Sequence, residues 1–133
     1  MPESLSISRI MQIAVNVHDL ARATAFYRDA LGLRLLFEVP GMAFFDCGGV
    51  RLMLARGETP ELDHPSSIIY FQVSDIQASF RALRERAVTV GSEPRLIARL
   101  ADREVWIADF HDSEENLLAL MSEPPLKPGD PVM

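Results

Sequence analysis

The first clear pattern along the chain is a strand followed by an amphipathic helix. Residues 9–17 form an apolar run in which every second position is strongly hydrophobic, which is typical of a strand with two unlike faces. Asp19 can cap a helix whose apolar side chains recur at helical spacing as far as Leu31, and Gly32 favours its C-terminal end. The pattern predicts one strand and one helix with a core-facing stripe.

Three short strand-like segments follow this helix. They cover residues 33–39, 42–48 and 50–56, and the turn signals Pro40-Gly41 and Gly48-Gly49 separate them. This spacing predicts an antiparallel meander. The next ten positions are polar, contain two prolines and break the pattern, so we expect an exposed linker over residues 57–66.

The same order of elements restarts after the linker. An apolar strand over residues 68–73 precedes Asp75, which can cap a second helix. That helix places Ile76, Phe80 and Leu83 on one face, whereas its charged residues, Arg81, Arg84, Glu85 and Arg86, belong mostly to the solvated side. Three weaker strand candidates follow, at residues 94–100, 104–110 and 116–122.

The two halves of the chain therefore repeat one another. Val17-x-Asp19-Leu20 matches Val73-x-Asp75-Ile76, and the segment from Asp46 to Leu54 matches the segment from Asp112 to Leu120. We predict a single α+β domain over residues 1–133, built from two tandem βαβββ modules. The modules cover about residues 9–56 and 67–122, and an irregular, proline-rich tail covers residues 123–133.

Composition and charge narrow the classes of function. With 48% hydrophobic and 24% charged residues the chain is typical of a globular protein, and the single cysteine, Cys47, excludes an intramolecular disulfide. A net charge of −6 disfavours nucleic acid and anionic membranes as partners. No apolar run approaches the roughly 20 residues that span a bilayer, and no leader pattern is present, so we expect a cytoplasmic protein.

Two motifs in the sequence resemble those of a known superfamily. Residues 13–20 and 25–33, which read IAVNVHDL and AFYRDALGL, are similar to the opening of vicinal oxygen chelate proteins, a superfamily that includes glyoxalase I, bleomycin resistance proteins and extradiol dioxygenases. Residues 110–118, FHDSEENLL, resemble its signature F-x-D-P-D-G-N-x-hydrophobic, with Ser, Glu and Glu in place of Pro, Asp and Gly. Together with the repeat, the resemblance spans about residues 9–122.

The resemblance implies curved sheets that form an open, barrel-like mixed sheet around a central cleft, and often a homodimer. In metalloenzymes of the superfamily, His, Gln or Glu side chains on four strands hold a metal ion there. The matching positions in this chain are Gln12, Met53, Ile68 and Ala119. Only Gln12 offers an oxygen ligand, so we expect no metal and no cofactor.

Alternation along the strands gives a candidate ligand site. If Gln12 faces the cleft, its neighbours at every second position do so too, and a small-molecule ligand would meet an apolar floor with a few polar groups. The candidate ligand-binding residues are Gln12, Asn16, Arg51, Met53, Ile68, Tyr70, Gln72, Trp106, Ala119 and Met121. Trp106, Phe44 and Phe45 could stack on a planar ligand.

Each of these side chains also has a simpler interpretation. Methionine and aromatic residues at strand spacing commonly fill a core. An inward-facing Arg51 needs an anionic partner, whereas an Arg51 on an edge strand would point to water. The sequence leaves both readings of Arg51 open.

Three hypotheses about function remain at this stage. The first is a metal-independent protein of the glyoxalase/bleomycin resistance type that sequesters or senses a small, planar, anionic ligand. The second is a metal-dependent lyase, isomerase or dioxygenase with atypical ligands, and the third is a non-catalytic partner domain. No catalytic triad order, phosphate loop or Cys-His pair argues independently for catalysis, so enzyme activity stays open.

Overall fold

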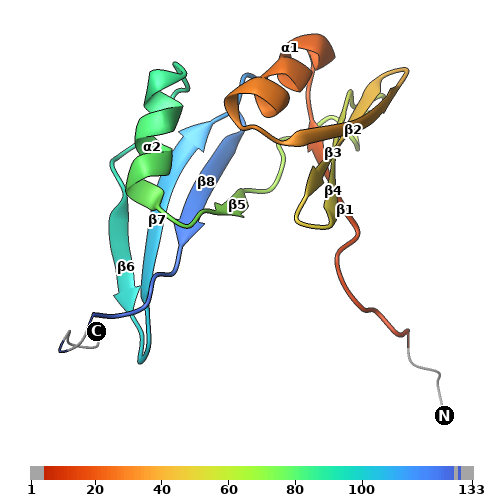
Figure 1. Ribbon diagram of the computed structural model, residues 1–133. Helices are drawn as coiled ribbons and strands as arrows, with labels where there is room; N and C mark the ends of the chain where they lie inside the picture. The colour runs from red at the N-terminus through yellow and green to blue at the C-terminus, as the bar shows by residue number, and fades with distance from the viewer. Residues whose placement is uncertain (1–4, 128, 130–133) are drawn as a thin grey trace.

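The computed structural model describes residues 5–127 and 129, and it contains two modules of the same topology (Figure 1). The first module consists of β1 (Gln12–Asn16), α1 (Leu20–Ala25) with a π-helical turn η1 (Phe26–Ala30), β2 (Arg34–Val39), β3 (Met42–Cys47) and β4 (Val50–Ala55). The second consists of β5 (Ile69–Gln72), α2 (Ile76–Glu85), β6 (Arg95–Arg99), β7 (Glu104–His111) and β8 (Leu117–Ser122). The predicted βαβββ repeat is therefore confirmed.

Each module forms its own four-stranded mixed sheet. The strand orders are β1-β4-β3-β2 and β5-β8-β7-β6, so the first and last strands of each module lie side by side and run parallel. The remaining neighbours are antiparallel. Within one chain the two sheets stay separate and do not close into a barrel, because each strand pairs only with strands of its own module.

The helices begin where the sequence predicts. The Asp19 carboxylate accepts a hydrogen bond from the backbone N–H of Arg22 at 3.1 Å, and that of Asp75 accepts one from Ala78 at 3.0 Å. The first helix ends differently from an ordinary α-helix, since the N–H of Leu31 bonds to the carbonyl of Phe26, five residues earlier, at 3.1 Å. No helix of the described part is long and apolar enough to cross a membrane.

One hydrophobic core connects the two modules. Its largest fully buried side chains include Val15, Tyr27 and Phe45 from the first module and Phe110 and Leu118 from the second. Apart from Tyr27, which comes from η1, these residues occupy the sheet faces that the helices cover, so the opposite face of each sheet is left for other contacts.

The C-terminal tail is more ordered than the sequence indicates. Arg103 and Pro125 form an isolated β-bridge, and the N–H of Glu104 donates to the carbonyl of Pro124 at 2.9 Å. These contacts hold the first tail residues against the start of β7. Residues 128 and 130–133 of the predicted tail lie outside the described residues.

Candidate functional site

The uncovered face of the first sheet, here called the first open face, gathers several of the predicted site residues. The strand register aligns Gln12 with Arg51 and Ala14 with Met53, and it aligns Phe44 of β3 with Met53. Because alternate side chains on a strand point to opposite faces and directly paired residues share a face, the first open face consists of Gln12, Ala14, Asn16, Arg34, Phe37, Val39, Met42, Phe44, Asp46, Arg51, Met53 and Ala55.

Arg51 lies near the start of β4 on this face and is held from two sides. Its Nε donates to Oε1 of Gln12 at 2.8 Å, and its guanidinium carbon lies 5.5 Å from the centroid of the Phe44 ring. The strand β4 is an interior strand of its sheet, so the reading of Arg51 as an edge-strand residue is wrong. Within the described residues, no carboxylate lies within ion-pair distance of Arg51.

An aromatic pair lies beside Arg51. The rings of Phe37 and Phe44 stack with centroids 4.4 Å apart and planes 20° apart. The sequence analysis missed Phe37, because simple alternation along β2 turns it toward the helix. A register shift between Leu35 and Phe37 places it opposite Phe44 instead, and nothing in the sequence marks that bulge.

The uncovered face of the second sheet, the second open face, carries the other predicted site residues. Tyr70 pairs with Ala119, and Gln72 pairs with Met121. Tyr70, Gln72 and Met121 line a cavity of about 390 Å³, whereas Ala119 is fully buried. Ile68 lies just before β5 and is exposed.

Trp106 lies apart from all of these residues. Its position opposite Ser122 in the β7–β8 register places it on the helix-covered side, where it packs against the core. Its indole N–H donates to Oε1 of Glu104 at 3.1 Å. Phe45, also considered for stacking, is fully buried beside Tyr27, so of the three aromatic candidates only Phe44 reaches an open face.

Asn16 contacts the linker. Its Nδ2 donates to Asp63 at 2.8 Å, and its Oδ1 accepts from the N–H of Gly57 at 3.0 Å. The linker residues Leu62 and His64 thereby line a cavity of about 200 Å³ together with Asn16, Met53 and other residues of the first open face. Most linker side chains are exposed, as predicted, but the hydrogen bonds of Asn16 to Asp63 and Gly57 hold the linker against the first sheet.

The predicted site therefore consists of two halves on separate sheets. Gln12, Asn16, Arg51 and Met53 occupy the first open face, whereas Tyr70, Gln72, Ala119 and Met121 occupy the second. Asn16 and Met53 line one cavity, and Tyr70, Gln72 and Met121 line another.

The four positions that correspond to metal ligands do not fit a divalent cation. The only oxygen of the Gln12 carboxamide already accepts from the cationic Arg51, and its Nε2 donates to the Met53 sulfur at 3.6 Å. Ile68 and Ala119 have no donor atom. Among the described residues, no group of three or more His, Cys, Asp or Glu side chains is arranged to hold a metal ion.

A comparison with protein families identifies the fold. The model of the Glyoxalase/Bleomycin resistance protein/Dioxygenase superfamily matches residues 9–120, which is most of the chain. The chain belongs to this superfamily. The match covers both modules, so the resemblance of the two sequence motifs is confirmed.

Curated proteins from bacteria are similar to this chain over different lengths. The Bacillus subtilis protein YraH is 26% identical over 129 residues, which cover 84% of this chain and 96% of that protein. The metallothiol transferase FosB from Staphylococcus haemolyticus is 30% identical over 89 residues, which cover 63% of this chain and 64% of FosB.

Solved structures of the superfamily share the fold. TnmS3, an antibiotic-binding protein from a Streptomyces species, aligns with a TM-score of 0.75 and 24% identity, over 90% of this chain and 99% of that chain. Lactoylglutathione lyase from Agrobacterium tumefaciens aligns with a TM-score of 0.70 and 22% identity, over 88% and 95% of the two chains. One superfamily fold thus carries both a binding protein and an enzyme, so the site must decide between these functions.

Proposed function

We propose that this protein binds a small, planar, anionic compound on its first open face, without a metal ion and without catalysis. The observation that carries the proposal is the position of Arg51, which is half-buried and fixed between the Gln12 carboxamide and the Phe44 ring. Asp46 lies opposite Arg51 in the β3–β4 register, but no carboxylate of the described residues comes within ion-pair distance of the guanidinium, so Arg51 can still pair with an anion from outside.

The groups around Arg51 favour an anion that carries both a carboxylate-like group and an aromatic ring. A guanidinium has five N–H donors, and only Nε is used by Gln12, so the two terminal nitrogens are left for a carboxylate or a similar group. The stacked rings of Phe37 and Phe44 provide an apolar plane beside the charge. An aromatic anion can therefore use both features at once.

Two further facts support a binding protein over an enzyme. TnmS3, which has the same fold, is an antibiotic-binding protein. The Gln12 oxygen faces Arg51 and not an empty coordination position. We keep the expectations of a cytoplasmic protein without nucleic acid or membrane partners as part of this proposal.

We also propose that a second copy of the chain completes the cleft. Each open face leaves large apolar side chains exposed, among them Phe37, Met42 and Val39 on the first sheet and Tyr70 and Leu117 on the second. A homodimer that placed the first open face of one copy against the second open face of the other would cover both sets and enclose Arg51.

Substitution of Arg51 tests the binding site. Arg51→Gln removes the charge but leaves an amide, and we expect the affinity for 2-naphthoate, measured by calorimetry, to fall about tenfold because a charge-assisted contact is lost. The matched control is Arg22→Gln on the exposed surface of α1, which should bind normally. Equal affinities in the two variants would contradict the proposal.

Metal analysis tests the proposed independence from metals. The alternative is an enzyme such as the metallothiol transferase that FosB is named for. Protein purified without chelators or affinity tags should contain far less than one equivalent of iron, nickel, zinc or manganese. A stoichiometric metal content that falls on substitution of Gln12 would overturn the metal-independent function.

A further inference from the structure

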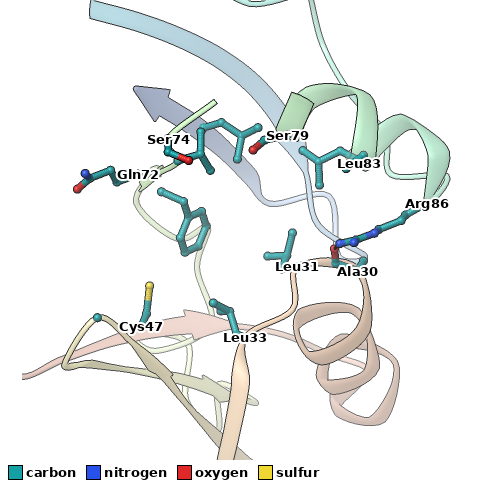
Figure 2. A pocket seen from close by; sticks show the side chains of 14 residues that line it. Ala30, Leu31, Leu33, Cys47, Gln72, Ser74, Ser79, Leu83 and Arg86 are labelled. Carbon is teal, nitrogen blue, oxygen red and sulfur yellow. Dashed lines mark hydrogen bonds between the residues drawn. The ribbon is translucent and has the colours of Figure 1, made fainter. Parts of the chain in front are cut away.

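A third cavity lies between the modules, and of the predicted site residues only Gln72 lines it. It has a volume of about 700 Å³ and opens between α2 and the segment that follows η1 (Figure 2). Leu31 and Leu33 come from the first module, and Phe71 and Leu83 come from the second. Leu31, Leu33 and Phe71 remain partly exposed, so apolar surface inside this cavity is left uncovered.

The surface of α2 that lines this cavity follows helical spacing. Ser79, Leu83 and Arg86 recur at intervals of four and three residues and therefore share one face of the helix. Arg86 is exposed, as expected of the α2 charges, and its Nη1 also crosses to the first module and donates to the carbonyl of Ala30 at 2.7 Å. Figure 2 shows its guanidinium at one end of the cavity and Cys47 near the other.

Arg86 is an available cation. Within the described residues, no carboxylate lies within ion-pair distance of it, although Arg28, Arg84, Arg95, Arg99 and Arg103 each have an acidic partner. The bond to Ala30 uses one of its five N–H donors. The cavity thus combines apolar walls with a fixed positive end.

We propose that this junction cavity is a second ligand site, which binds an amphipathic monocarboxylate with its carboxylate at Arg86 and its apolar body along Leu31, Phe71 and Leu83. Its volume lies within the range of about 300–1,000 Å³ that is typical of small-molecule sites. The neutral hydroxyls of Ser74 and Ser79 line it as further hydrogen-bonding groups. Since both modules contribute walls, the ligand stabilises the junction between them.

Cys47 provides a direct readout of occupancy. It is the only cysteine in the chain and lines this cavity, so one alkylation event reports on one site. Burial, and then the neighbouring Asp46, raise the pKa of its thiol, so the reaction with iodoacetamide is best followed above neutral pH.

The experiment compares octanoate with octylamine, which has a similar apolar chain and the opposite charge. We expect octanoate to raise Tm and to slow alkylation of Cys47, and octylamine to do neither at the same concentration. Arg86→Gln keeps a donor for the Ala30 carbonyl but removes the charge, so it should weaken octanoate binding about fivefold. Arg86→Lys should restore part of the affinity, and Arg81→Gln, an exposed position on the same helix, should bind octanoate normally.

Three results would overturn this inference. The first is equal protection of Cys47 by octanoate and octylamine, and the second is an equal loss of affinity in Arg86→Gln and Arg81→Gln. The third is alkylation that slows with rising protein concentration in the absence of octanoate, which would mean that a second copy covers the cavity. Arg51→Gln should leave octanoate protection of Cys47 unchanged, so failure here is distinguishable from failure of the proposed first site.

Discussion

Asp112 makes a buried polar contact between the modules. Asp112 is 6% exposed, and its carboxylate accepts a hydrogen bond from the Tyr27 hydroxyl of the first module at 2.7 Å. Within its own module the carboxylate accepts from the backbone N–H groups of Glu114 and Asn116 at 2.8 and 2.9 Å, and from Nδ2 of Asn116 at 2.9 Å. Tyr27 belongs to the first sequence motif, and Asp112 and Asn116 belong to the second. The two motifs that identify the superfamily are therefore in contact and join the modules.

Removing the Tyr27 hydroxyl should destabilise the protein. Tyr27→Phe keeps the buried ring but deprives the Asp112 carboxylate of one donor, and we expect the free energy of unfolding to fall by about 1.5–3 kcal/mol. Urea unfolding followed by circular dichroism measures this change. Tyr70→Phe is the matched control, because Tyr70 is the other tyrosine in the chain and is 51% exposed, so its effect should stay within about 0.5 kcal/mol.

The same contact predicts a dependence on alkaline pH. Burial first, and then the charge of Asp112, raise the pKa of Tyr27 well above its ordinary value. The neutral hydroxyl therefore contributes stability that is complete below the unfolded pKa of about 10 and is lost as the pH rises above it. Unfolding should become easier above that pH in the wild type, and less steeply in Tyr27→Phe; parallel slopes would contradict the assignment.

Single residues also show where inference from the sequence stops. Alternation along the strands proposed Arg51 as a cleft residue together with Gln12, but it did not give the pairing of Arg51 with Gln12. Its cation-π contact and its fixed geometry depend on Phe44, which comes from another strand. Trp106 was included for its chemistry alone, and one residue of register in β7 decides that it faces the helix.

At the level of elements, the linker between the modules is fixed by contacts that no periodic pattern encodes. Asp63 accepts hydrogen bonds from Asn16 at 2.8 Å and contacts His18 Nε2 at 2.9 Å. Glu114, from the turn before β8, accepts from the N–H groups of His18 and Asp19 at 2.6 and 3.2 Å. The end of β1 therefore binds both the linker and the second module.

Loss of the Asp63 carboxylate should release the linker. We expect Asp63→Asn to increase the rate of proteolytic cleavage within residues 57–66 by about fivefold at most, because the contacts are solvent-exposed. Glu61→Gln is the control, since it lies in the same exposed segment and removes the same charge. Cleavage at equal rates in the two variants would show that Asp63 does not hold the linker.

The pKa of Asp63 gives the pH range of this effect. Hydrogen bonds from Asn16, and then from His18, lower the pKa of its carboxyl group. Because its pKa is lower in the folded state, the ionised Asp63 carboxylate stabilises the fold above its unfolded-state pKa of about 3.9. This stability is lost as the pH falls through the folded-state pKa. The difference between wild type and Asp63→Asn should therefore persist at neutral pH and disappear in strong acid.

The elements themselves were largely predictable. The eight strands and two helices were expected close to their observed bounds, because turn residues such as Pro40-Gly41 and the capping carboxylates of Asp19 and Asp75 mark them directly. The bulge in β2 and the π-helical turn η1 were not expected, since no periodic pattern or turn residue in the sequence marks either of them.

At the scale of the whole molecule, the separation of the two open faces is the feature that bears most on function. The sequence predicted which residues line a cleft but could not predict how the modules are placed. In one chain the modules meet through the helix-covered core and the Asp112 contacts, which leaves both open faces uncovered. A cleft that uses both faces therefore requires a second copy of the chain.

Mixing two defective chains tests this arrangement. One chain carries Arg51→Gln on its first open face, and the other carries Tyr70→Ala on its second. We expect each homodimer to bind 2-naphthoate weakly, because both of its clefts contain one defect. A mixed dimer, isolated with two different affinity tags, contains one cleft with both defects and one with neither. Calorimetry should then recover half of the wild-type binding capacity at the wild-type affinity.

If each cleft instead belonged to a single chain, the mixed dimer would bind as weakly as its parents, because neither chain would have an intact pair of faces.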